Sequence, residues 1–114
     1  LLPHPQEGIR MVIGFTNTTA WNHLVTYDYV ATFRPERKNK YGKDWVNRGR
    51  GEEKEFDCQI IEVGKVEFGE DETLLEKLAE SSGFEDKETW KHAIESIHGE
   101  LPDQGFVYLV RKLN

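Results

Sequence analysis

Cysteine is almost absent from this chain of 114 residues, which contains only Cys58. A single thiol cannot form an intrachain disulfide, and it cannot build a zinc site made of cysteines. Cys58 lies in the strand-like run FDCQIIEV, and no activating base stands beside it in the sequence. We therefore expect a small buried hydrophobic side chain rather than a nucleophile.

Long apolar runs and metal-binding patterns are also missing. No stretch approaches the roughly 20 apolar residues of a membrane helix, and the opening LLPHPQEGIR does not have the form of a secretory signal. The four histidines are not spaced like metal ligands, and acidic residues at a helix start are expected from the helix dipole. We expect a cytoplasmic protein with no membrane segment, no metal and no other cofactor.

Length and composition favour a single globular domain. The chain has 37% hydrophobic and 32% charged residues, which is ordinary for a folded domain of this size. No internal repeat or flexible linker divides it. Because Met11 is a plausible native start, we interpret residues 1–10 as a leader of uncertain origin and residues 11–114 as one domain.

Charge is distributed unevenly along the chain, whose net charge is −6. Residues 34–50 contain seven basic side chains against Glu36 and Asp44, a local balance of +5. Residues 52–103 contain seventeen acidic side chains against five lysines, a balance of −12. The position of charge matters more for binding than its total, so the basic segment is the strongest functional signal in the sequence.

Hydrophobic periodicity predicts an α+β fold. Apolar or alternating runs predict strands at residues 11–15, 29–34, 44–47, 55–68 (bent near Gly64) and 105–110. Capping residues and apolar stripes predict helices near residues 20–25, 71–83 and 86–99, with the hydroxyls of residues 16–19 available to cap the first. This order favours a small β-barrel with two to three helices packed at its side.

Three features in a fixed order resemble the ASCH domain of the PUA-like superfamily, over residues 29–113. The first is a strand that ends in a T-x-R signature, and the second is a G-x-D turn before the next strand. The third is a helical stretch that contains a glycine-phenylalanine pair. In this chain they are spelled Thr32, Phe33, Arg34; Gly42, Lys43, Asp44; and Ala79, Glu80, Gly83, Phe84, Trp90, Ile94, Gly99.

The resemblance implies a PUA-like barrel with Arg34 at the mouth of its cleft. Members of this family are thought to bind RNA, and some bacterial branches hydrolyse acetylated cytidine or cleave RNA. Where the amidohydrolase branch has a lysine and a glutamate, this chain has Tyr29 and Ser82. Neither replacement supplies the missing amine or carboxylate, so hydrolysis is disfavoured and Thr32 and Glu80 remain only weak catalytic candidates.

Positive charges and aromatic rings alternate in the basic segment, and this combination suits RNA. Lysine and arginine contact phosphates, while unpaired bases stack on aromatic rings or guanidinium planes. We predict recognition of single-stranded or modified RNA through a basic cleft. The predicted RNA-binding residues are Arg34, Arg37, Lys38, Lys40, Tyr41, Lys43, Trp45, Arg48 and Arg50.

Several alternatives remain open at the level of sequence. The basic segment can be a solvated loop that offsets the acidic remainder, and Arg34 can form a salt bridge with a carboxylate. Trp45 can anchor the barrel or stack on a base. The NRGRG run at residues 47–51 can be a hairpin turn or can bring backbone amides to a phosphate. Hydrolysis of a modified nucleoside or RNA, and a protein-interaction module with an acidic partner, are the alternative functions.

Overall fold

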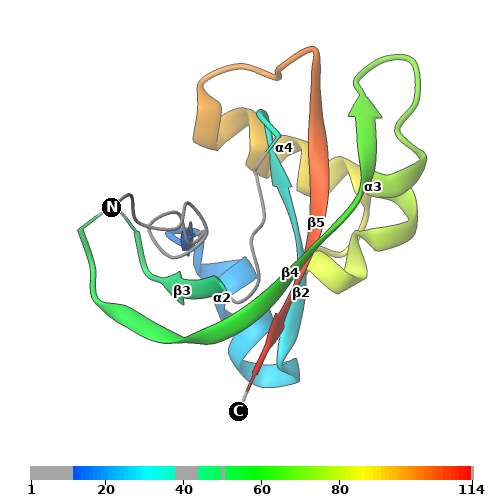
Figure 1. Ribbon diagram of the computed structural model, residues 1–114. Coiled ribbons are helices and arrows are strands. Elements are labelled where there is room, and N and C mark those ends of the chain that lie inside the picture. Colours follow the sequence, from blue (N-terminus) through cyan, green and yellow to red (C-terminus); the bar gives the residue numbers. More distant parts are fainter. Residues whose placement is uncertain (1–11, 38–43, 50, 114) are drawn as a thin grey trace, which may run out of the picture.

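The computed structural model describes residues 12–37, 44–49 and 51–113, which form a curled sheet with helices packed against both faces (Figure 1). The strands are β1 (Val12–Gly14), β2 (Tyr29–Arg34), β3 (Asp44–Asn47), β4 (Lys54–Glu67) and β5 (Gln104–Lys112). The helices are α2 (Thr18–Tyr27), α3 (Thr73–Leu78) and α4 (Lys87–His98), and the 3-10 turn η1 (Glu80–Ser82) lies between the last two. The predicted α+β class is confirmed.

The sheet has the strand order β1-β3-β4-β5-β2. The pairs β3–β4, β4–β5 and β5–β2 are antiparallel, whereas β1 runs parallel to β3. The long strand β4 pairs with β3 through its first residues, up to Cys58, and with β5 from Cys58 onward. It therefore connects the β1-β3 side of the sheet with the β5-β2 side and curves through the molecule (Figure 1). The register shifts between Glu62 and Gly64, at the predicted bend.

The predicted closed barrel is not confirmed, because the sheet is not closed. Strands β1 and β2 form its two edges, and no backbone pairing joins them in the described residues. Strand β1 is only three residues long, and β2 ends before Pro35, which has no N–H to donate to a ladder. The side chain of Arg34 spans the gap instead, since its Nη2 donates to the carbonyl oxygen of Gly14 at 2.9 Å.

Two hydrophobic clusters lie on opposite faces of the sheet. Along β5, Tyr108 and Val110 belong to the cluster that α2 covers, whereas Val107 belongs to the cluster that α3 and α4 cover. This alternation is the period of two expected of a strand that is buried on both faces. Trp90 is 3% exposed and packs in the second cluster, as its apolar stripe predicted. Because both faces are covered, β2 has a fixed position against the helices.

Helix ends set the position of the segments around β2. Asn17 caps α2 by accepting a hydrogen bond from the Ala20 amide at 3.0 Å, so an amide side chain performs the role predicted for threonine hydroxyls. Asp28, with φ of 68°, takes the left-handed conformation at the end of α2, and β2 begins at the next residue. Asp86 caps α4, as predicted.

None of the helices in the described part of the chain has the length and apolarity to cross a membrane.

Cys58 is fully buried in the first cluster. Burial, together with the nearby carboxylates of Asp44 and Asp57, raises the pKa of its thiol to about 12, and burial is the largest cause. The thiolate is therefore essentially absent at neutral pH, and the prediction of a buried, unreactive side chain agrees with this environment.

Candidate functional site

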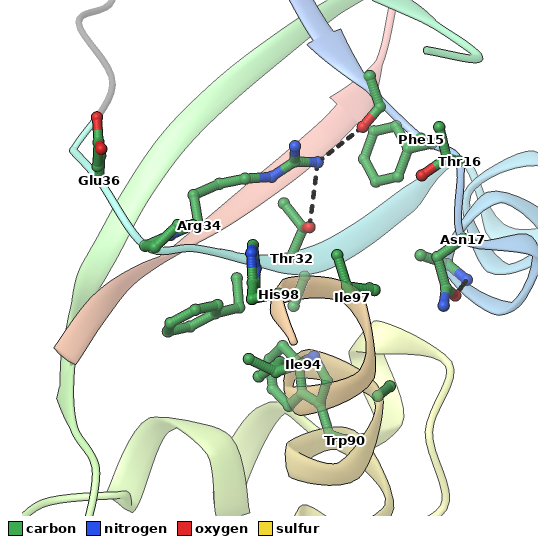
Figure 2. Close-up of a pocket in the computed structure, with 16 residues that line it drawn as sticks. Phe15, Thr16, Asn17, Thr32, Arg34, Glu36, Trp90, Ile94, Ile97 and His98 are labelled. Carbon is green, nitrogen blue, oxygen red and sulfur yellow. Dashed lines mark hydrogen bonds between the residues drawn. The ribbon is translucent and has the colours of Figure 1, made fainter. Parts of the chain in front are cut away.

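A pocket of about 330 Å³ lies along the free edge of β2. The end of β1 and the start of α2 form one wall, the last residues of β2 form another, and α4 supplies the floor (Figure 2). The volume is at the lower end of the range for small-molecule sites, and it suits a group the size of one nucleobase. The polar side chains at this pocket come from three elements that are separate in the sequence.

Arg34 is the central polar side chain of the pocket. Its Nη2 donates to the Gly14 carbonyl at 2.9 Å and to Thr32 Oγ1 at 3.4 Å (Figure 2). Thr32 and Arg34 stand two residues apart on β2, so both side chains project from the same face of the strand. The guanidinium carbon lies 5.4 Å from the centre of the Phe15 ring. These contacts hold the guanidinium in one orientation along the edge of β2.

The remaining donors of Arg34 are not fully used. Its Nε is buried and has no hydrogen-bond partner, and no salt bridge of Arg34 occurs within the described residues. Desolvation lowers the pKa of Arg34 to about 10, although the electrostatic effect of Tyr108 partly opposes this shift. The alternative of a salt bridge is therefore not observed. Leaving a buried donor without a partner costs about 1–3 kcal/mol, which an acceptor on a ligand can recover.

The floor of the pocket is largely apolar. Trp90, Ala93 and Ile94 of α4 line it, and the exposed side chains of Ile97 and His98 stand at its rim. Figure 2 shows Trp90 and Ile94 of α4 below the strand that carries Thr32 and Arg34. An apolar floor beside a fixed cationic donor can hold a flat ring that carries hydrogen-bond acceptors.

The other described residues of the predicted RNA-binding set do not line this pocket. Arg37 pairs with Glu62 at 3.0 Å, and its guanidinium lies 4.7 Å from the centre of the Phe106 ring. Trp45 keeps partial exposure and belongs to neither hydrophobic cluster. The predicted residues Lys38, Lys40, Tyr41, Lys43 and Arg50 lie outside the described residues.

Arg48 stabilises the wall of the pocket from outside it. Its Nε donates to the Phe15 carbonyl at 3.2 Å, and its guanidinium lies 4.7 Å from the centre of the Trp21 ring. In the following turn the Gly49 amide donates to Asn47 Oδ1 at 3.1 Å, so this amide already has a partner. The contacts favour the hairpin-turn interpretation of residues 47–51 over phosphate binding by the backbone.

The weak catalytic candidates do not come together. Thr32 lines the Arg34 pocket, whereas Glu80 and Tyr29 line a second depression beside the C-terminal half of α2. Ser82 is buried, and its hydroxyl donates to the carbonyl of Ala79. Thr32 and Glu80 therefore do not line one cleft.

Sequence reasoning missed several pocket residues. Phe15 and Asn17 precede the segment that carries the family resemblance, and His98 is not among the predicted site residues. The apolar stripe of α4 correctly predicted that Trp90 and Ile94 face inward. The stripe alone could not predict that the C-terminal end of α4 borders a pocket, because the pocket depends on the distance between the edge strands β1 and β2.

Comparison with known proteins adds no family assignment. No protein-family model, curated protein or solved structure matches the chain. Within residues 12–37, 44–49 and 51–113, no three histidine, cysteine or acidic side chains gather in an arrangement that could hold a metal ion. The resemblance to the ASCH domain remains a prediction from the sequence.

Proposed function

We propose that this domain binds single-stranded RNA and accepts one unpaired nucleobase in the Arg34 pocket. The observation that carries the proposal is the Nε of Arg34, a buried donor without a partner beside an apolar floor. Nucleobases carry carbonyl and ring-nitrogen acceptors in one plane, and arginine contacts such edges with parallel hydrogen bonds. The geometry favours a base over an aliphatic ligand for this reason.

The dimensions of the pocket support a single-stranded partner. About 330 Å³ accommodates one ring system, and an unpaired base can leave its stack to enter such a space. A base in a duplex presents its acceptors only within a groove, which the recessed guanidinium of Arg34 does not reach. The exposed imidazole of His98 at the rim offers a surface for stacking.

Positive charge in residues 34–50 supports contacts to the phosphates on either side of the bound base. This segment has a balance of +5 and continues directly from the strand that carries Arg34. For single-stranded nucleic acid, each neutralised phosphate contributes about 0.7 to the slope of log affinity against log salt. Arg37 is partly neutralised by Glu62, so we expect it to contribute less than an unpaired cation.

The resemblance to the ASCH domain agrees with RNA binding, since members of that family are thought to bind RNA. The alternative of a hydrolase gains no support from the geometry, because Thr32 and Glu80 line different pockets. We therefore propose a binding domain rather than an enzyme.

The proposal is tested by measuring the affinity of short single-stranded and duplex RNA with fluorescence anisotropy at two salt concentrations. We expect tighter binding of the single strand, with affinity that falls as salt rises. Arg34→Met should weaken binding about ten- to a hundredfold, because hydrogen bonds to a charged group contribute about 1.5–3 kcal/mol. Arg111→Met removes the same charge from an exposed arginine whose side chain donates to Gln59 Oε1, and serves as the matched control.

Two results would contradict RNA binding at this pocket. One is the absence of any RNA affinity at low salt. The other is an equal loss of affinity in Arg34→Met and Arg111→Met, because this would indicate a general electrostatic effect rather than a specific contact.

A further inference from the structure

A second depression, of about 710 Å³, lies beside the C-terminal half of α2. Its walls come from α2, from Tyr29 at the start of β2, and from η1 and the segment that follows it. It shares no lining residue with the Arg34 pocket. The depression beside α2 is therefore a separate site on the molecule.

Three rings meet in this depression, and we call His23, Tyr27 and Tyr29 the ring cluster. The centre of the His23 ring lies 4.7 Å from that of Tyr27 and 5.2 Å from that of Tyr29. Tyr27 is 61% exposed and Tyr29 is 37% exposed, so neither ring is buried in the hydrophobic core. The face of a tyrosine ring carries negative electrostatic potential and attracts an ammonium or guanidinium group.

The hydrogen bond of His23 adds an acceptor to the cluster. Its Nδ1 lies 2.8 Å from the carbonyl oxygen of Tyr29, and a carbonyl can only accept, so Nδ1 carries the proton of the neutral ring. The other ring nitrogen, Nε2, is then an acceptor. A primary ammonium group has N–H donors for this acceptor, whereas a quaternary ammonium group has none.

Acidic side chains border the ring cluster. Glu80 and Glu85 line the same depression. Both carboxylates are exposed. They disfavour phosphate and favour a partner that carries positive charge.

We propose that the ring cluster binds a lysine side chain of a basic peptide that belongs to a protein partner. The ammonium group packs against the faces of Tyr27 and Tyr29, donates to His23 Nε2, and is attracted by the carboxylates of Glu80 and Glu85. This site goes beyond RNA binding and does not depend on the Arg34 pocket.

The test titrates the full chain with a synthetic peptide of about eight residues that contains lysines, and follows binding by calorimetry. A peptide of the same sequence with acetylated lysines is the first control. We expect acetylation to abolish measurable binding, because it removes the charge and most of the donors. Tyr27→Leu should weaken binding of the lysine peptide about two- to fivefold, which is the range for a cation at an exposed aromatic ring.

Two further variants separate the local contact from general electrostatics. Glu85→Gln removes a carboxylate that lines the depression, whereas Glu95→Gln removes an exposed carboxylate of α4 that does not. Of these two variants, only Glu85→Gln should weaken binding of the lysine peptide. Tyr27→Leu should leave the affinity for RNA unchanged. Equal binding of the acetylated peptide, or unchanged binding by Tyr27→Leu, would overturn the proposal. Loss of RNA affinity in Tyr27→Leu without loss of peptide binding would assign the rings to base stacking and would also overturn it.

Discussion

Nη2 of Arg34 lies 2.9 Å from the carbonyl oxygen of Gly14, and this contact joins the two edge strands of the sheet. In a closed barrel, backbone hydrogen bonds between β1 and β2 would fill this space. Here a side chain crosses the gap, and the space that remains beside it is the pocket. The same arginine therefore connects the sheet edges and lines the pocket between them.

Arg34→Met tests whether the charge of Arg34 serves stability or binding. Methionine keeps part of the apolar length of the side chain but removes a desolvated charge, and this gain offsets the loss of hydrogen bonds to Gly14 and Thr32. We expect the free energy of unfolding in urea to change by about 1 kcal/mol or less. A loss of several kcal/mol would indicate that Arg34 is primarily a structural link between the strands.

Gly105→Ala should destabilise the end of β2. A Cβ at Gly105 would lie 2.1 Å from Phe33 Cζ and 2.8 Å from the carbonyl oxygen of Arg34, so ring and strand must both move. Overpacking of this kind costs about 1–3 kcal/mol in a well-packed core. We expect a lower urea midpoint and weaker RNA binding, because the displaced strand carries Arg34.

The double variant Gly105→Ala, Phe33→Leu provides the control for this prediction. The shorter leucine side chain removes the ring atoms nearest the new methyl group, so part of the loss should be recovered relative to the two single variants. Strict additivity of the two losses would contradict the proposed clash.

Asp86 should make the start of α4 sensitive to acid. Hydrogen bonds from the amide and hydroxyl of Thr89 lower the pKa of Asp86 below its ordinary value of 3.8. Because the folded pKa is the lower one, the stabilisation is complete above pH 3.8 and is lost as pH falls through the folded pKa. Asp86→Asn keeps a good capping side chain without a titrating group.

We therefore expect Asp86→Asn to lose less thermal stability than the wild type between pH 7 and about pH 2.5, measured by circular dichroism. The titration of Asp71 and Glu72, whose pKa values are also lowered by hydrogen bonds, is common to both proteins and cancels in the comparison. An identical acid-induced loss in the two proteins would contradict the role assigned to Asp86.

Cys58 should be unreactive in the folded protein. It is fully buried, and its raised pKa, about 12, leaves almost no thiolate at neutral pH. We expect a thiol-specific reagent to label Cys58 only when denaturant unfolds the chain, with the rate followed by absorbance. Rapid labelling in native buffer would show that the region around β4 opens readily.

Local patterns were sufficient to predict most of the fold. Strands β2 and β3 have the predicted bounds. Each is marked by residues that are close together in the sequence: a β-branched run before Pro35 for β2, and a short apolar run between loops for β3. The strand β4 begins one residue earlier than predicted and shifts register at the predicted bend. Helix α4 begins after its predicted cap, Asp86, because the capping contact spans only three residues.

The candidate site was only partly predictable. Thr32 and Arg34 of the T-x-R signature line the same pocket, because residues two apart on a strand share a face. The other walls depend on contacts over long sequence separations, such as that between Gly14 and Arg34. No local pattern encodes how far β1 lies from β2, so the open sheet and the contribution of Phe15 required the structure.

In the proposed complex, the Nε–H of Arg34 donates a hydrogen bond to an acceptor of the bound nucleobase. The most direct measurement is the ¹H–¹⁵N spectrum of the arginine side chains during titration with a short single-stranded RNA, with the Nε–H of Arg34 assigned by its loss in Arg34→Met. We expect a saturating downfield shift of this resonance and slower exchange with solvent, while the Arg111 resonance stays unchanged. Saturation of the protein with RNA while the Arg34 resonance does not move would contradict it.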